Sequence, residues 1–132
     1  MTKYILLYLA TVPVFFLIDL VWLGVVARDF YRSQIGSLMA DPIVWWAAIL
    51  FYLLFIAGIA VLPGLDAGSW MKALMLGAAF GFFAYMTYDL TNLATLRGWP
   101  ITLVVVDIAW GTVLAASVAT ASYFIGTRIF GS

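Results

Sequence analysis

Four long apolar runs constrain the fold of this chain more than any other feature. They cover approximately residues 4–26, 42–62, 70–93 and 101–126 of the 132 residues. About 20 predominantly apolar residues are enough to cross a bilayer as an α-helix, so each run can form one span. The sequence therefore predicts an all-α integral membrane protein. We expect a single transmembrane domain, an antiparallel four-helix bundle with both termini on one side of the membrane.

The composition supports the same fold class. Hydrophobic residues make up 67% of the chain and charged residues 9%, whereas a soluble domain carries about 25% charged residues. The net charge is zero, and the sequence offers no basic patch for nucleic acid. The absence of Cys and His excludes disulfides, thiolate chemistry and Cys/His zinc sites. We therefore expect the lipid bilayer as a partner, no nucleic acid, and no cofactor.

Local signals mark several helix boundaries. Asp41 and Pro42 precede the second run as an N-cap and a first helical residue, and Ser69 is placed to cap the third. Pro13 lies inside the first run and predicts a kink there. The second run carries no acidic or basic residue, so we expect it to be the most lipid-exposed wall of the bundle.

The segment between the first two runs, residues 27–41, predicts a short amphipathic helix. Phe30, Ile35, Leu38 and Met39 recur at helical spacing, and most charged residues of the segment fall on other faces. A helix with one apolar face and one polar face is typical of the membrane interface. An ordinary loop is the alternative.

Small residues recur every four positions in the last two runs. The two stripes consist of Ala73, Gly77 and Gly81, and of Gly111, Ala115 and Ala119. Small residues at this spacing let helix backbones approach closely in lipid, where hydrophobic burial provides no drive for association. We expect this packing inside the chain rather than between two copies of it.

Three aspartates interrupt the apolar runs: Asp19, Asp89 and Asp107. A carboxylate at the bilayer centre costs roughly 2.5–3.5 kcal/mol on insertion scales, and ionisable groups in spans often mark functional sites. Because successive spans cross in opposite directions, all three fall in the same half of the bilayer, at depths that agree within about one helical turn. We expect them to share one polar cavity.

Aromatic and polar neighbours complete the predicted site. The predicted ligand- or proton-binding residues are Asp19, Asp89, Asp107, Trp22, Trp110, Tyr88 and Asn92, and the predicted charge partners are Arg28, Arg32 and Arg97. The pattern Asp-x-x-Trp occurs at Asp19 and again at Asp107, in oppositely directed runs. The alternatives are solvation of Asp89 at the interface, structural hydrogen-bonded acids at the other two positions, and simple packing of the tryptophans.

Three functions stay open. The favoured one is binding or transport of a small cation or amphiphile, with proton linkage because burial and neighbouring carboxylates favour protonated acids. The second is a membrane enzyme acting on a lipid or isoprenoid, in which the acids hold Mg²⁺ or Mn²⁺. No nucleophile motif or phosphate loop supports it. The third is a structural or accessory subunit.

Three fragments of the sequence carry a family resemblance: FLIDLVWLG, YDLTNLATLRGWP and VVVDIAWG. Together they resemble a family of small bacterial membrane proteins catalogued as domain of unknown function 2177, over the whole chain. The resemblance implies a four-span protein of the bacterial inner membrane. It implies no particular reaction, substrate or cofactor.

Basic residues do not fix the orientation in the membrane. Three lie on each predicted side: Lys3, Lys72 and Arg128 on the side of the termini, and Arg28, Arg32 and Arg97 on the other. Cytoplasmic segments normally carry the excess. Lys3 beside the first run favours cytoplasmic termini, with the acids in the periplasmic half. The balance also permits both orientations, and with them an antiparallel homodimer.

Overall fold

The computed structural model describes residues 2–38, 44–59 and 68–130, and every regular element in these residues is helical. The elements are α1 (Thr2–Val21), a π-helical turn (Trp22–Val26), α2 (Arg28–Ile35), a 3-10 turn (Gly36–Leu38), α3 (Trp45–Ile59), α4 (Trp70–Thr95) and α5 (Ile101–Phe130). The predicted all-α class is therefore confirmed for the described part of the chain.

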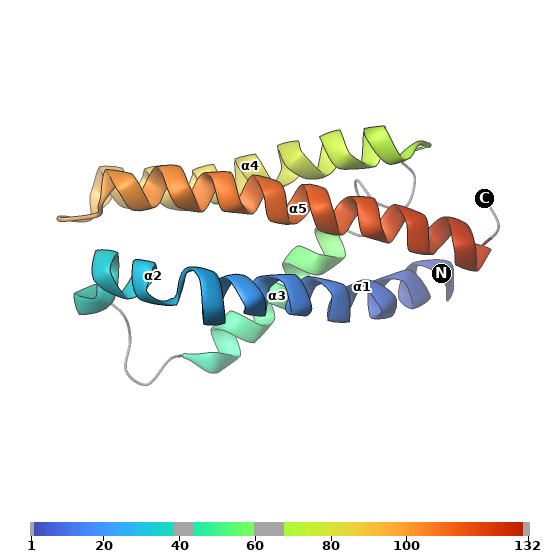
Figure 1. Ribbon diagram of the computed structural model, residues 1–132, viewed down its shortest axis with the longest axis horizontal. Helices are drawn as coiled ribbons and strands as arrows, with labels where there is room; N and C mark the ends of the chain where they lie inside the picture. The colour runs from blue at the N-terminus through green and yellow to red at the C-terminus, as the bar shows by residue number, and fades with distance from the viewer. Residues whose placement is uncertain (1, 39–43, 60–67, 131–132) are drawn as a thin grey trace.

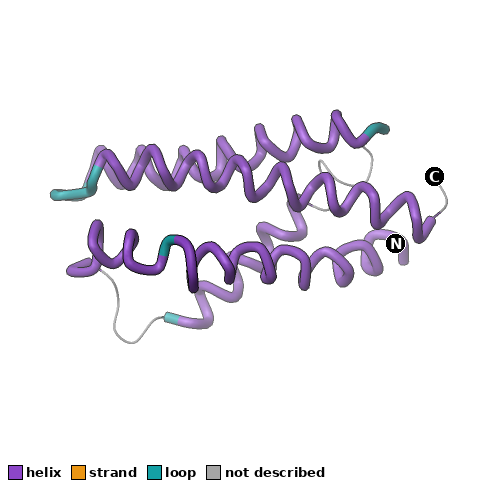
Figure 2. The backbone as a smooth tube through the Cα atoms, viewed as in Figure 1, coloured by secondary structure: helices purple, strands orange, loops and turns teal. Residues whose placement is uncertain are grey.

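The helices lie in two layers (Figure 1). Helices α4 and α5 run side by side as one antiparallel pair, and α1 lies against α5. Helix α2 continues beyond the end of α1, while α3 crosses α1 obliquely. The first and last described residues lie at the same end of the molecule, opposite α2 (Figure 2).

Within the part of the chain that the structure describes, three segments are long and apolar enough to cross a membrane: Ile5–Val26, Trp70–Thr95 and Ile101–Arg128. Helix α3 has 15 residues, which corresponds to about 22 Å at 1.5 Å per residue and is shorter than a hydrocarbon core of about 30 Å. The remaining residues of the predicted second span, and the Asp41-Pro42 start, lie outside the described residues. The structure thus gives three long apolar helices and a shorter one.

The ends of helices α4 and α5 differ slightly from those of the predicted runs. Helix α4 continues to Thr95 and α5 to Phe130, beyond the predicted ends at 93 and 126. Ser69 caps α4 as predicted, because its hydroxyl accepts a hydrogen bond from the Lys72 N–H at 3.1 Å. Pro13 is accommodated within α1.

The predicted helix in residues 27–41 is present as α2 and the following 3-10 turn, while residues 39–41 lie outside the described part. Its expected apolar face is divided. Phe30 and Ile35 pack against a cluster around Trp99, whereas Leu38 is exposed. The π-helical turn before α2 was not predicted; it ends the first span and leads into α2.

The small-residue stripes of α4 and α5 pack directly against each other. A Cβ atom on Gly77 would lie 2.6 Å from both the Ala115 carbonyl oxygen and the Ala119 Cβ. A Cβ on Gly81 would lie 2.6 Å from the Ala115 Cβ and would overlap the Gly111 carbonyl. Only glycine fits at such separations, so the prediction of close packing inside the chain is confirmed.

Helix α3 is not simply the lipid-exposed wall expected from its lack of charge. Phe55, Ile56 and Ile59 are buried against α1 and α5, while Trp46 and Leu54 are exposed. The buried residues and Tyr52 recur at the three- and four-residue spacing of one helix face. A uniformly apolar sequence hides this face, because apolar residues occupy both the lipid side and the protein side.

Candidate functional site

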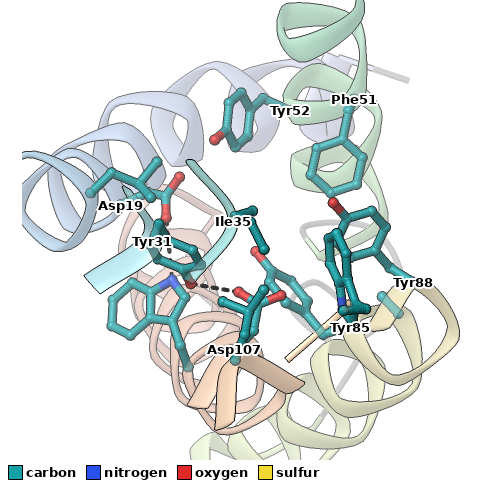
Figure 3. Close-up of a pocket in the computed structure, with 13 residues that line it drawn as sticks. Asp19, Tyr31, Ile35, Phe51, Tyr52, Tyr85, Tyr88 and Asp107 are labelled. Carbon is teal, nitrogen blue, oxygen red and sulfur yellow. Dashed lines mark hydrogen bonds between the residues drawn. The ribbon is translucent and has the colours of Figure 1, made fainter. Parts of the chain in front are cut away.

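A cavity of about 380 Å³ lies near the end of the bundle that carries α2 (Figure 3). Of its thirteen lining residues, seven are aromatic and two are acidic, and none is basic. The set is Asp19, Leu23, Tyr31, Ile35, Phe51, Tyr52, Ala84, Tyr85, Tyr88, Trp99, Leu103, Asp107 and Trp110. These residues come from all five α-helices, the π-helical turn and the residues joining α4 to α5.

Asp19 lies on the buried face of α1 and is 4% exposed. The same face buries Phe15, one helical turn earlier. Trp110 of α5 donates a hydrogen bond from its indole Nε1–H to Asp19 Oδ1 at 3.3 Å. The hydroxyl of Tyr52, from α3, points toward the same carboxyl group (Figure 3). Three helices thus converge on this acid.

Asp107 of α5 faces the cavity from the opposite layer and is 7% exposed. The Tyr31 hydroxyl of α2 donates a hydrogen bond to its Oδ1 at 2.5 Å (Figure 3). Trp22 in turn donates from Nε1–H to the Tyr31 oxygen at 3.2 Å. Burial, and then the adjacent Asp107 carboxyl, raise the pKa of Tyr31 above its ordinary value. The phenol is therefore held in its neutral, donating form.

The two Asp-x-x-Trp motifs are joined crosswise. Trp22 and Trp110 stack with ring centroids 4.3 Å apart and an interplanar angle of 6°. Trp110, of the second motif, donates to Asp19 of the first. Trp22, of the first motif, reaches Asp107 of the second through Tyr31. Each acid therefore depends on a tryptophan from the other helix.

Asp89 lies on α4 outside the cavity lining and is 0% exposed. Its neighbours are the Asp107 carboxyl and the indole of Trp99. Neither carboxylate oxygen has a hydrogen-bond partner among the described residues, and neither has the Trp99 Nε1–H. The interfacial solvation considered for this acid does not match its burial.

The other predicted site residues are more peripheral. Tyr88 lines the cavity but is 54% exposed, and Asn92 is half-buried and does not line it. The predicted charge partners, Arg28, Arg32 and Arg97, are all exposed. In the described part of the chain, the groups that donate to Asp19 and Asp107 are aromatic, so pairing with arginine stays a prediction.

Five aromatic residues line the cavity without being in the predicted set: Tyr31, Phe51, Tyr52, Tyr85 and Trp99. Tyr85 has a clear signal, since it continues the small-residue stripe of α4 one turn before Asp89. Tyr52 shares a helix face with Phe55 and Ile56, but nothing in its sequence context is polar. The position of Tyr31 depends on the π-helical turn, which the sequence pattern did not predict.

Within residues 2–38, 44–59 and 68–130, no set of three acidic side chains has the spacing needed to hold a metal ion. Asp19 and Asp107 face one cavity, and Asp89 lies beside Asp107.

Comparison with known proteins identifies one family. The family model described as "predicted membrane protein", domain of unknown function 2177, matches residues 4–124 of the chain. No curated protein and no solved structure matches it.

Proposed function

We propose that this chain, which belongs to the family of predicted membrane proteins named above, binds a small organic cation or a cationic amphiphile in the aromatic and acidic cavity. The bound cation and protons displace each other. The proposal includes a four-span bundle in a bacterial inner membrane, with residues 42–62 as the second span. It also includes cytoplasmic termini, and hence a cavity in the periplasmic half.

The observation that carries the proposal is the chemistry of the cavity wall. Asp19 and Asp107 face the same space as seven aromatic side chains, and no basic side chain lines it. An ammonium group over an aromatic face gains about 0.5–2 kcal/mol, most when it is desolvated. Buried carboxylates need a compensating charge. A cation with apolar substituents satisfies both requirements at once.

The size of the cavity also suits a small molecule. A volume of about 380 Å³ falls at the lower end of the range for ligand pockets, about 300–1,000 Å³. The wall is mainly aromatic, with few polar groups at fixed positions, which is the usual composition of such pockets. An inorganic ion alone would leave most of this apolar wall without contacts.

Exchange with protons follows from the same charges. When the cation leaves, the two carboxylates remain in a low-dielectric site whose described hydrogen-bond donors, Tyr31 and Trp110, are neutral. Protons from the aqueous phase can then replace the lost positive charge, so that binding of one displaces the other. This exchange makes cation affinity fall as the pH falls.

Calorimetry on the purified protein in detergent tests the proposal. The probes are benzyltrimethylammonium and its neutral carbon isostere, neopentylbenzene. We expect the cation to bind, and Asp19→Asn and Asp107→Asn each to weaken binding at least about tenfold, which corresponds to about 1.4 kcal/mol. Asp29→Asn is the matched control, because Asp29 is exposed on α2 and does not line the cavity.

The outcomes separate binding from a structural role. Equal binding of the cation and the neutral isostere would remove the electrostatic part of the proposal. Unchanged cation affinity in both cavity variants would overturn it. If those variants lost thermal stability and the wild-type protein bound no cation, the acids would instead be structural hydrogen-bond acceptors.

A further inference from the structure

Asp89 is the buried polar group that the proposed cation site does not use. It is 0% exposed, and both of its carboxylate oxygens lack a hydrogen-bond partner among the described residues. A buried carboxylate in this condition costs several kcal/mol if it is charged. Native proteins rarely leave such a group unsatisfied. Something small must therefore complete this site.

The surroundings of Asp89 limit what that can be. On the side of α5 lies the Asp107 carboxyl, and on the side of the α4–α5 connection lies Trp99. Trp99 is 7% exposed and packs against Leu103 and Val104 at the start of α5. Its indole N–H can supply one donor at most. A second donor has to reach an acid that already faces another acid.

Two adjacent carboxyl groups meet this need by sharing a proton. Like charges at close range prevent both acids from ionising together, and a protonated acid donates its O–H to the neighbouring carboxylate. The Tyr31 hydroxyl already donates to Asp107 Oδ1. It therefore stabilises the charged form at Asp107 and favours the proton on Asp89.

We propose that Asp89 and Asp107 hold one proton between them at neutral pH, and form a proton-binding site separate from Asp19. The inference deepens the proposed function. It rests on that function only for the cation-binding role of the cavity acids. It adds a proton pair between α4 and α5 to the two cavity acids, so that Asp107 belongs both to this pair and to the cation site. The single proton comes from water and returns to it, with no other reactant.

The titratable groups facing the pair are few. Phenols approach from three helices: Tyr31 from α2, Tyr52 from α3, and Tyr85 and Tyr88 from α4. The ordinary pKa of a phenol side chain is about 10. Asp19 faces Asp107 across the cavity from α1. Among the described residues, the exposed Arg28, Arg32 and Arg97 make no hydrogen bond to either acid of the pair. Asp19 is therefore the described acid that can contribute to the same titration, and the Asp19→Asn variant removes its contribution.

Infrared difference spectroscopy on the ligand-free protein tests the pair directly. The C=O stretch of a protonated carboxyl group is recorded while the pH is raised from acid to alkaline. We expect the wild-type protein to show at neutral pH a component of this band that Asp19→Asn keeps, and to lose that component on alkaline titration. In Asp89→Asn the neutral amide replaces the protonated acid, so that component should be absent at neutral pH.

The same measurement on other variants makes the assignment specific. Asp29→Asn, on the exposed face of α2, should keep the band, while Asp107→Asn should shift it because the remaining acid loses its carboxylate partner. Circular dichroism confirms that each variant is folded. Absence of the band from wild type at neutral pH, or its loss in Asp19→Asn instead of Asp89→Asn, would overturn the inference. Neither result depends on cation binding, so failure of the proposed function is distinguishable from failure of the proton pair.

Discussion

The two ends of the α4–α5 pair use opposite packing strategies. At the end nearer the termini, Gly77 and Gly81 bring the backbone of α4 against Ala115 and Gly111, so that not even a methyl group fits between the helices. At the other end the same two helices place Tyr85, Tyr88 and Asp107 around an open cavity. The change occurs within one helical turn, where the Tyr85 ring covers Gly111.

The comparison shows how a small membrane protein can keep a cavity open. Hydrophobic burial does not hold helices together in lipid, so close van der Waals packing has to do so. The small-residue stripes supply that packing at one end. The other end can then hold large side chains apart, with polar contacts from Trp110 and Tyr31 fixing their positions.

The largest effect is expected from a substitution at the close-packed end. In Gly81→Ala the new methyl group would overlap the Gly111 carbonyl and lie 2.6 Å from the Ala115 Cβ, and overpacking of this kind costs about 1–3 kcal/mol. The unfolding free energy in mixed detergent micelles measures the loss. Gly24→Ala is the control, since nothing lies within 4 Å of its Cβ position and surface changes stay within about 0.5 kcal/mol. Equal losses of unfolding free energy in both variants would contradict the role of the small-residue stripes.

Filling the open end should affect binding rather than stability. Ala84 lines the cavity on α4, so Ala84→Phe places a ring in space that is already available. We expect affinity for benzyltrimethylammonium to fall at least about tenfold, or about 1.4 kcal/mol, with little change in the thermal midpoint. Ala79→Phe, at an exposed position of the same helix, should bind normally. Unchanged affinity in Ala84→Phe would place the cation outside this cavity.

The smallest effect concerns the link between α2 and the cavity. Tyr31→Phe removes the hydroxyl that donates to Asp107, and one such bond is worth about 0.5–1.5 kcal/mol. Because the pKa of Tyr31 is raised by burial and by Asp107, the neutral phenol's stabilisation is fully present below about pH 10, the ordinary tyrosine value. It is lost as the pH rises through the raised value. Unfolding measurements should thus show a constant wild-type advantage from pH 7 to 10; a gap that closes below pH 10 would contradict the assignment.

The sequence predicted the parts of the fold that depend on local pattern. The apolar runs locate α1, α4 and α5, Ser69 marks the start of α4, and the four-residue stripes identify the close-packed face. The shared depth of the three aspartates was predicted from alternating span direction and remains a prediction together with the spans. The helical class and the family are confirmed, while the number of spans remains a prediction.

The aromatic half of the site could not be predicted in the same way. Tyr52 lies in an apolar run where every face has the same hydropathy, so nothing in the pattern separates its protein-facing side from its lipid-facing side. Tyr31 reaches Asp107 from α2, whose start follows a π-helical turn. A π-helical turn depends on the balance of backbone hydrogen bonds in one turn, and few sequence signals report it.

The crossed pairing of the two Asp-x-x-Trp motifs has a consequence for biogenesis. Asp19 and its donor Trp110 are 91 positions apart. At about 5–20 residues per second of synthesis, the indole arrives on the order of 5–20 s after the carboxyl group. During that interval the first helix enters the bilayer with an acid that has not yet met its tryptophan. Insertion machinery or headgroup water must shelter the acid until the last helix arrives, so a ribosome stalled before α5 should leave the first helix poorly retained in the membrane.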